Sequence, residues 1–257
     1  MAYKSGKHSQ FSLAYGRFFQ NPNAEVLKFE NNLNPENATH FIANFQYVGK
    51  NQIFRVEAYH KSYDNLIKFD TELPGFSTAY NNLGFGEASG VDVFWRDNRS
   101  FKNLEYWTSY SFLDTERDYR NFPEAARPGF ASAHNASLVT KYWIEDWKSQ
   151  LGFSYVFATG RNYTNPNQPG FLNQKTKTFH NLSFNWAYLI DQQKILYFSV
   201  SNVLNTRNVF GYTYANQADA NGVFQRQAIV PNDDQFFFVG FFWTLSDDKT
   251  SNQLNNL

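Results

Sequence analysis

The sequence predicts an all-β fold, an antiparallel transmembrane β-barrel of about ten strands. Three patterns in its 257 residues favour this fold: apolar and polar side chains alternate, the alternating segments are long, and their connections are short and long in turn. No helical period competes with the alternation, and no stretch is apolar and long enough to predict a transmembrane helix.

Alternation of side chains is the dominant pattern. The large residues Leu151, Phe153, Tyr155 and Phe157 alternate with Gly152, Ser154, Val156 and Ala158, and the same pattern recurs at 11–16, 41–47, 182–190 and 196–201. A β-strand projects successive side chains to opposite faces, so each segment has one large apolar face and one small or polar face.

Charged residues follow the same alternation. Within their segments they fall on the polar face, and the clearest examples are Arg55, Glu57, Asp92, Arg96 and Lys141. A charge that faces an apolar core is costly unless it is paired, so this face is expected to be wet. We therefore expect these five residues to line the lumen of a barrel; the simpler interpretation for any one of them is pairing across strands.

Segment length separates membrane strands from ordinary ones. The predicted strands are 9–20, 38–49, 51–72, 78–97, 102–114, 133–145, 148–160, 177–190, 193–205 and 234–246. Strands of globular proteins average about five or six residues, whereas a tilted membrane strand needs about nine to eleven. The lengths therefore favour a membrane barrel.

The connections differ in length in a regular way. Tight turns are expected at 49–51, 145–148 and 191–194, and long loops rich in Asn, Pro and Gly at 21–37, 114–134, 161–177 and 205–234. Short turns at one end and long loops at the other are the layout of outer-membrane barrels. Aromatic pairs near strand ends, such as Tyr106-Trp107 and Tyr142-Trp143, are typical of the interfacial girdles of such barrels.

Composition narrows the chemistry. The formal net charge is zero, which gives no basic face for nucleic acid, and the absence of Cys excludes thiol chemistry and zinc–thiolate sites. The five histidines form no pair with metal-ligand spacing, and no Gly-x-Ser-x-Gly nucleophile motif occurs. We therefore expect no enzyme activity, no cofactor and no metal site.

Several short segments resemble one protein family in order and spacing. They are 196–205 (LYFSVSNVLN), 209–214 (VFGYTY), the ending 236–245 (FFFVGFFWTL), and the segments 65–67, 90–93 and 158–164. Together they resemble the C-terminal half of the barrel of TonB-dependent outer-membrane receptors, particularly those of Bacteroidetes. The resemblance covers nearly the whole chain.

The resemblance implies a location, partners and a function. Complete members have a barrel of about twenty-two strands filled by a plug, and they import iron chelates, cobalamin or glycans with energy transmitted by TonB. Residues 1–257 are then expected to be one barrel domain in the lipid bilayer of the outer membrane, with 246–257 as a polar tail. Because no plug and no export signal are recognised in the sequence, a barrel fragment is expected.

Two further expectations concern ligands and alternatives. The loops at 161–176 and 211–226 are expected to form a ligand-binding rim, with Arg161, Asn162, Tyr163, Tyr212 and Tyr214 as candidate contacts. Alternation alone would also fit a soluble carbohydrate-binding β-sandwich, whose exposed aromatics would stack on sugars, or a small passive porin.

Overall fold

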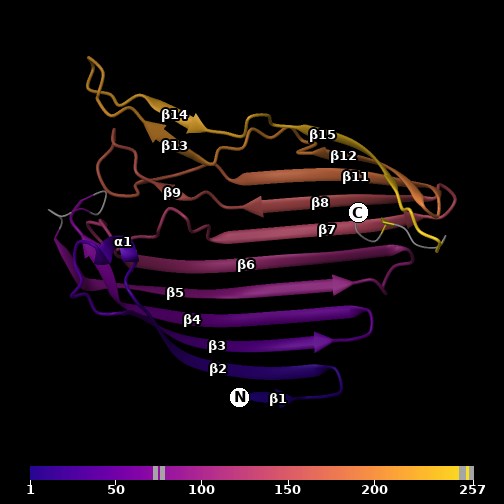
Figure 1. Cartoon of the computed structure of the whole chain (residues 1–257), viewed down its shortest axis with the longest axis horizontal. Helices are drawn as coiled ribbons and strands as arrows, with labels where there is room; N and C mark the ends of the chain where they lie inside the picture. The colour runs from indigo at the N-terminus through magenta and orange to yellow at the C-terminus, as the bar shows by residue number, and fades with distance from the viewer. Residues whose placement is uncertain (72–74, 76–78, 249–252, 255–257) are drawn as a thin grey trace.

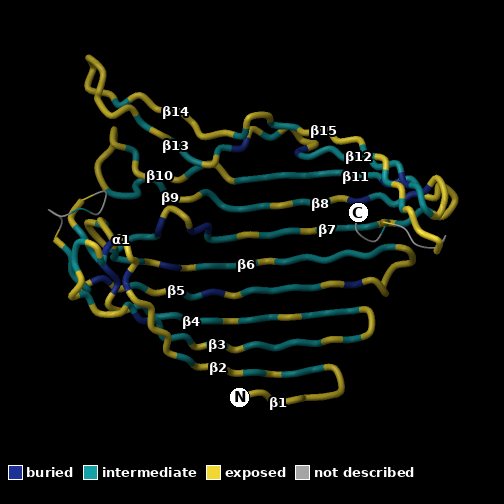
Figure 2. Tube along the Cα trace, in the orientation of Figure 1, coloured by how far each residue is buried: buried dark blue, intermediate teal, exposed yellow. Residues whose placement is uncertain are grey.

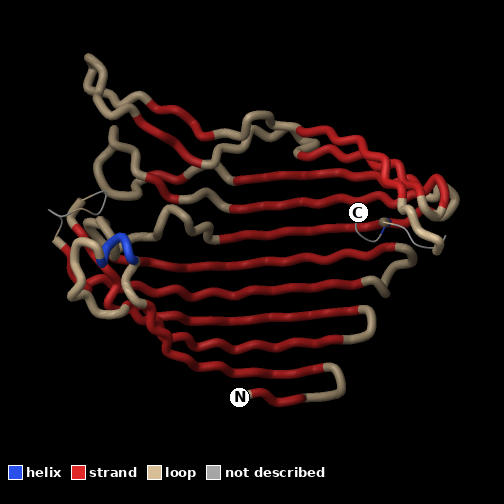
Figure 3. Tube along the Cα trace, viewed as in Figure 1, coloured by secondary structure: helices blue, strands red, loops and turns tan. Residues whose placement is uncertain are grey.

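A computed structural model describes residues 1–71, 75, 79–248, 253 and 254. Nearly all of the regular structure is β-strand (Figure 3), apart from one helical turn, α1 (Ala24–Leu27), in the part of the chain described. No helix in the described ranges is long and apolar enough to cross a membrane. The strands form one eleven-stranded sheet and two small hairpins.

The large sheet is antiparallel, and its strands follow one another in chain order (Figure 1). They are β1 (Ala2–Lys4), β2 (Ser9–Gln20), β3 (Glu36–Val48), β4 (Gln52–Phe69), β5 (Tyr80–Asp97), β6 (Leu104–Asp118), β7 (His134–Ile144), β8 (Ser149–Ala158), β11 (Phe179–Asp191), β12 (Lys194–Ser201) and β15 (Phe236–Trp243). The hairpins are β9 (Asn162–Tyr163) with β10 (Gln174–Lys175), and β13 (Gly211–Tyr214) with β14 (Arg226–Ile229).

The predicted all-β, antiparallel architecture is confirmed, and each of the ten predicted segments contains a strand of the sheet. Position 72 of one predicted strand and position 78 of the next lie outside the described residues. Strand β1 and the two hairpins were not anticipated. The predicted loop start at Asp114 is wrong, because β6 continues to Asp118 and pairs with β5 along that stretch.

Strand β12 ends four residues earlier than predicted, and Asn202 explains why. Its φ of 50° takes the chain out of the extended conformation. Its amide nitrogen donates to the carbonyl oxygens of Thr206 (2.9 Å) and Asp234 (2.7 Å), and its amide oxygen accepts from the Thr206 N–H. The buried Asn202 thus closes the loop where the sequence reads as a continuing strand.

Connections differ between the two ends of the sheet, as predicted. One end, at the right in Figure 1, has only short turns, such as those at 49–51 and 145–148, and we call it the short-turn end. The other end carries α1, both hairpins and the connections 21–35, 119–133, 159–178 and 202–235, and we call it the long-loop end.

One face of the sheet is apolar and open. We call it the apolar face; it carries Phe41, Val56, Phe112, Phe153 and Phe237. Phe41 is 52% exposed, Phe153 46% and Phe237 61%. Along the sheet in Figure 2, dark blue for buried residues is sparse. Each long strand has its extensive contacts with its hydrogen-bonded neighbours. A sandwich would instead cover such a face with a second sheet.

The tryptophans mark one end of the sheet. The six tryptophans are Trp95, Trp107, Trp143, Trp147, Trp186 and Trp243, and all lie in the half of the sheet nearer the short-turn end. Two of their indole N–H groups have hydroxyl partners: Trp95 donates to Tyr106 (3.2 Å) and Trp186 to Ser149 (2.9 Å). Register places Trp95, Trp186 and Trp243 on the apolar face, where such rings are typical of a membrane interface, and Trp107 and Trp143 on the opposite face.

Gly90 shows how tightly the wall is built. A Cβ at this position would overlap with the hydroxyl of Tyr59 on β4 and with the carbonyl oxygen of Phe112 on β6. Tyr59 lies directly opposite Gly90 in the strand pairing, so its ring occupies the space that a side chain would need.

We therefore expect Gly90→Ala to lower the free energy of unfolding by about 1–3 kcal/mol, the usual cost of overpacking. Denaturant unfolding in detergent, followed by tryptophan fluorescence, measures the change. Gly6→Ala is the control, because a Cβ there has open space around it. Equal effects of the two substitutions would contradict this account of the wall.

Candidate functional site

The opposite face of the sheet carries a row of polar side chains near its middle, and we call it the polar face. Strand register places Asn44, Glu57, Asp92, Ser111 and Asn135 side by side across β3 to β7. Residues two apart in a strand share a face, so Arg55, Ser109 and Ser137 extend this polar patch in the adjacent row.

The polar patch is hollowed. A cavity of about 470 Å³ is lined by Asn44, Arg55, Glu57, Asp92, Ser109, Ser111, Asn135 and Ser137 together with Phe94 and Val156. Three of the predicted lumen-lining residues, Arg55, Glu57 and Asp92, therefore meet at one place. Its carboxylates, guanidinium and hydroxyls suit polar solutes or an inserted polar domain.

The charges in this cavity do not simply cancel across strands. Glu57 and Asp92 are direct cross-strand partners, so two carboxylates face each other. Asp92 accepts a hydrogen bond from the Ser111 hydroxyl. Within the described residues, Arg55, Glu57 and Asp92 form no ion pair. Like charges placed opposite each other are unfavourable, so pairing across strands does not account for this pair.

The other two predicted residues lie nearer the short-turn end. The Arg96 Nε donates to Glu105 Oε1 at 2.7 Å, and the two side chains form an ion pair. Lys141 lies opposite Glu105 in the register between β6 and β7. Arg96 and Lys141 do not line the cavity, and Arg96 follows the simpler interpretation of cross-strand pairing.

Four of the five predicted ligand-loop residues fall in the two hairpins, and three of these four form one cluster at the long-loop end. The rings of Tyr163 and Tyr212 lie 4.8 Å apart, and the Arg226 guanidinium carbon lies 4.4 Å from the Tyr212 ring centre. Tyr214 is opposite Arg226 in the β13–β14 hairpin. Burial, and then the neighbouring Tyr163, raises the pKa of the Tyr214 phenol.

The remaining two loop candidates have structural contacts. The backbone N–H of Arg161 donates to the Thr176 hydroxyl at 2.9 Å, and its side chain is exposed. The side-chain oxygen of Asn162 is buried and has no hydrogen-bond partner among the described residues. Both residues lie beside the tyrosine cluster because they directly precede Tyr163 in the chain.

One asparagine joins the two loops. Asn167 donates from its side chain to the carbonyl oxygen of Phe224 (2.9 Å) and accepts from the Phe224 N–H (2.8 Å), although the residues are 57 apart in sequence. The loops at 159–178 and 202–235 are therefore one unit rather than two independent flaps.

Two arginines at the long-loop end were not among the candidate residues predicted from the sequence. Arg226 contacts Tyr212, and the Arg117 guanidinium lies 4.3 Å from the Tyr63 ring, 5.5 Å from Phe130 and 5.8 Å from Tyr119. The Arg117 Nε is buried without a hydrogen-bond partner in the described structure. Alternation could have placed Arg117 on the polar face had the strand been extended to Asp118; nothing in the sequence pairs Arg226 with Tyr212.

No cluster of three or more His, Asp or Glu side chains within the described ranges is arranged to hold a metal ion.

The family model "TonB dependent receptor-like, beta-barrel" matches residues 2–203. No curated protein matches the chain in sequence.

Solved structures with the same fold are numerous. The siderophore receptor PiuA of Acinetobacter baumannii has a TM-score of 0.70 at 12% identity, over 94% of this chain and 34% of that one. The ferric-catecholate import receptor Fiu of E. coli scores 0.68 at 10% identity, over 94% and 34%. The FrpB iron transporter of Neisseria meningitidis scores 0.63 at 12%, over 94% and 37%. This chain spans about a third of the length of these structures, and the likeness shows the fold alone.

The opposed carboxylates lead to a stability prediction. Glu57→Gln removes one charge from a like-charged pair, so we expect it to raise the free energy of unfolding by about 0.2–1 kcal/mol at low ionic strength. The gain should shrink in 1 M salt, where the screening length is only about 3 Å. Glu124→Gln in an exposed loop is the control. Destabilisation by Glu57→Gln would mean that Glu57 has an attractive partner.

The joined loops lead to a prediction about opening. Asn167→Ala removes both bonds to Phe224, together worth about 1–3 kcal/mol. Hydrogen–deuterium exchange should therefore become faster across 219–226, and cleavage by trypsin after Arg226 should speed up. The exposed Asn216→Ala in the same loop is the control. Unchanged exchange in Asn167→Ala would show that other contacts hold the loops together.

Proposed function

Because the chain belongs to the TonB-dependent receptor-like β-barrel family, we propose that it forms part of the wall of an outer-membrane receptor that takes up a nutrient in an energy-coupled step. We treat residues 1–257 as one barrel domain, with 246–257 as its polar tail. The barrels of this family are outer-membrane proteins, and the solved structures with this fold are receptors and transporters.

The observation that carries the proposal is the contrast between the two faces. The apolar face is open and aromatic over long strands, which suits lipid. The polar face holds the hollow around Arg55, Glu57 and Asp92, which suits a lumen that contains water, solute or a plug. A soluble sandwich would bury an aromatic face of this extent against a second sheet.

The lengths of the connections give the orientation in the membrane. Outer-membrane barrels have short turns on the periplasmic side and long loops outside the cell. The long-loop end, with Tyr163, Tyr212 and Arg226, then lies outside the cell, and the tryptophan-rich end lies at the periplasmic interface. TonB acts through a plug domain within the barrel rather than on these strands.

The ligand class follows from what the outer cluster offers. Three tyrosines and an arginine provide aromatic surface, hydroxyls and positive charge, which suit an anionic or aromatic chelate. Several solved structures with this fold are named for iron uptake. We propose an iron chelate as the first ligand to test, ahead of cobalamin and glycans.

Uptake in cells that carry the whole receptor tests this proposal. Radiolabelled ferric catecholate and ferric citrate are supplied to cells with and without TonB. We expect Tyr212→Ala to weaken binding at least about tenfold, because aromatic residues central to an interface contribute about 2 kcal/mol or more. Phe101→Ala, an exposed aromatic at the short-turn end, is the control and should leave uptake unchanged.

Two outcomes would count against the proposal. Uptake that proceeds equally without TonB would point to a passive porin. Normal uptake in Tyr212→Ala would remove the aromatic cluster from the binding site while leaving the barrel assignment intact.

A further inference from the structure

A second polar hollow lies at the long-loop end, away from the lumen-facing cavity. It has a volume of about 360 Å³ and is lined by Arg127, His134, Thr159, Lys175, Thr176 and Thr178, with Ala133 and Gly160. Its lining combines two cationic side chains, a histidine and three hydroxyls, and it contains no carboxylate. We call it the rim pocket.

Register places the rim pocket on the apolar side of the sheet. Thr159 directly follows β8, two residues after Phe157, and its N–H still bonds to the His134 carbonyl oxygen at 2.9 Å; Thr178 directly precedes β11, two residues before His180. Phe157 and His180 pair directly and their rings lie 5.4 Å apart on the apolar face. The pocket therefore opens at the long-loop end of the sheet, just beyond the aromatic residues of the apolar face.

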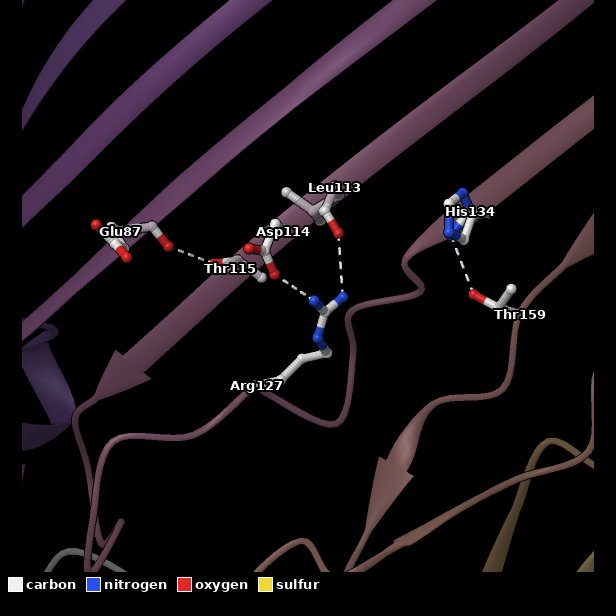
Figure 4. A network of polar contacts seen from close by, with 7 residues as sticks. All are labelled: Glu87, Leu113, Asp114, Thr115, Arg127, His134 and Thr159. Carbon is white, nitrogen blue, oxygen red and sulfur yellow. Dashed lines mark hydrogen bonds and ion pairs between the residues drawn. The ribbon is translucent and has the colours of Figure 1, made fainter.

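Arg127 is held in place from β6. Its guanidinium donates to the carbonyl oxygen of Leu113 at 3.0 Å and forms an ion pair with Asp114 (Figure 4). The Arg127 side chain is only 24% exposed, while Asp114 is 67% exposed. A guanidinium fixed in this way still has N–H groups to offer, so its direction is set before any ligand arrives.

His134 links the rim pocket to the aromatic surface below it. Its ring lies 5.2 Å from Phe112, and its Nδ1 is 2.8 Å from the Tyr110 hydroxyl. Its backbone N–H donates to the Thr159 hydroxyl at 3.0 Å, as Figure 4 shows. Polar pocket and aromatic surface are thus continuous across one residue.

The neighbouring charges confine where an anion can lie. On the other side of Arg127, a smaller hollow is lined by Glu87, Asp114 and Glu116. Those carboxylates repel an anion, so the Lys175 side is the favourable one. Lys175 is exposed and has no ion pair in the described part of the chain.

From this arrangement we propose that the rim pocket binds the phosphate of an outer-leaflet lipid, whose acyl chains lie against Phe112 and Phe157. Arg127, Lys175 and the threonine hydroxyls supply donors for phosphate oxygens. The apolar surface directly below favours a lipid phosphate over a free one, which would gain nothing from it. The inference rests on the membrane orientation in the proposed function, and it concerns a surface separate from the lumen.

Binding in neutral detergent tests the proposal on the full receptor chain. The probes are lipid A with both phosphates, the same lipid with its phosphates removed, and inorganic phosphate. Lys175→Gln should weaken binding of the phosphorylated lipid about three- to tenfold, as expected for one partly exposed charge-assisted contact. Lys177→Gln, the same change two residues further at an exposed position outside the pocket, should alter binding less than twofold.

Selective loss in Lys175→Gln supports the proposal. Equal binding of the two lipids, equal effects of both substitutions, or competition by inorganic phosphate at the same concentration as lipid would overturn it. Arg127→Lys, which keeps the charge but not the planar fork, should also weaken lipid binding. Normal iron uptake without selective lipid binding would remove this inference alone, whereas selective lipid binding without TonB-dependent uptake would remove only the proposed function.

Discussion

Backbone pairing along very long strands is the constraint on which the structure depends. A strand whose side chains face hydrocarbon cannot give its N–H and C=O groups to water, so neighbouring strands must accept and donate them. β4 and β5 each run for 18 residues, and they remain in register from Gln52 to Tyr63 before a shift near Leu66. This ladder uses no side chain, which leaves the two faces free to differ.

The two faces of the sheet differ in polarity along the middle of the strands but not near the long-loop end. Over the middle of the sheet, the apolar face carries aromatic and aliphatic residues, and the charges Arg55, Glu57 and Asp92 lie on the other face. Nearer the long-loop end this separation stops: Glu87 and Asp114 lie on the same side of the sheet as the apolar face, although both are charged. Strands that continue beyond the hydrocarbon return to water, where a carboxylate costs little.

The same physics explains how much could be predicted from sequence. Alternation is local and has a fixed period, so it located all ten long strands and assigned Arg55 and Asp92 to the polar face. It failed where a single residue decides the backbone, as Asn202 does with a φ of 50° and bonds to distant carbonyls. It also failed at β13 and β14, whose short strands are held by pairing with each other rather than by an apolar face.

The partners of a residue across neighbouring strands were the hardest feature to predict from the sequence. Which residue faces Glu57 depends on the lengths of turns and on every register upstream, so no local pattern reveals that Asp92 is opposite. Lys175 and Arg127 are 48 positions apart in the sequence. They share a pocket because the β9–β10 hairpin brings Lys175 next to the 119–133 connection. A residue's face is therefore a property of the sequence around it, whereas its partners are a property of the whole wall. This is why alternation could place Arg55, Glu57 and Asp92 on one face, whereas their neighbours across the strands could not be predicted from the sequence.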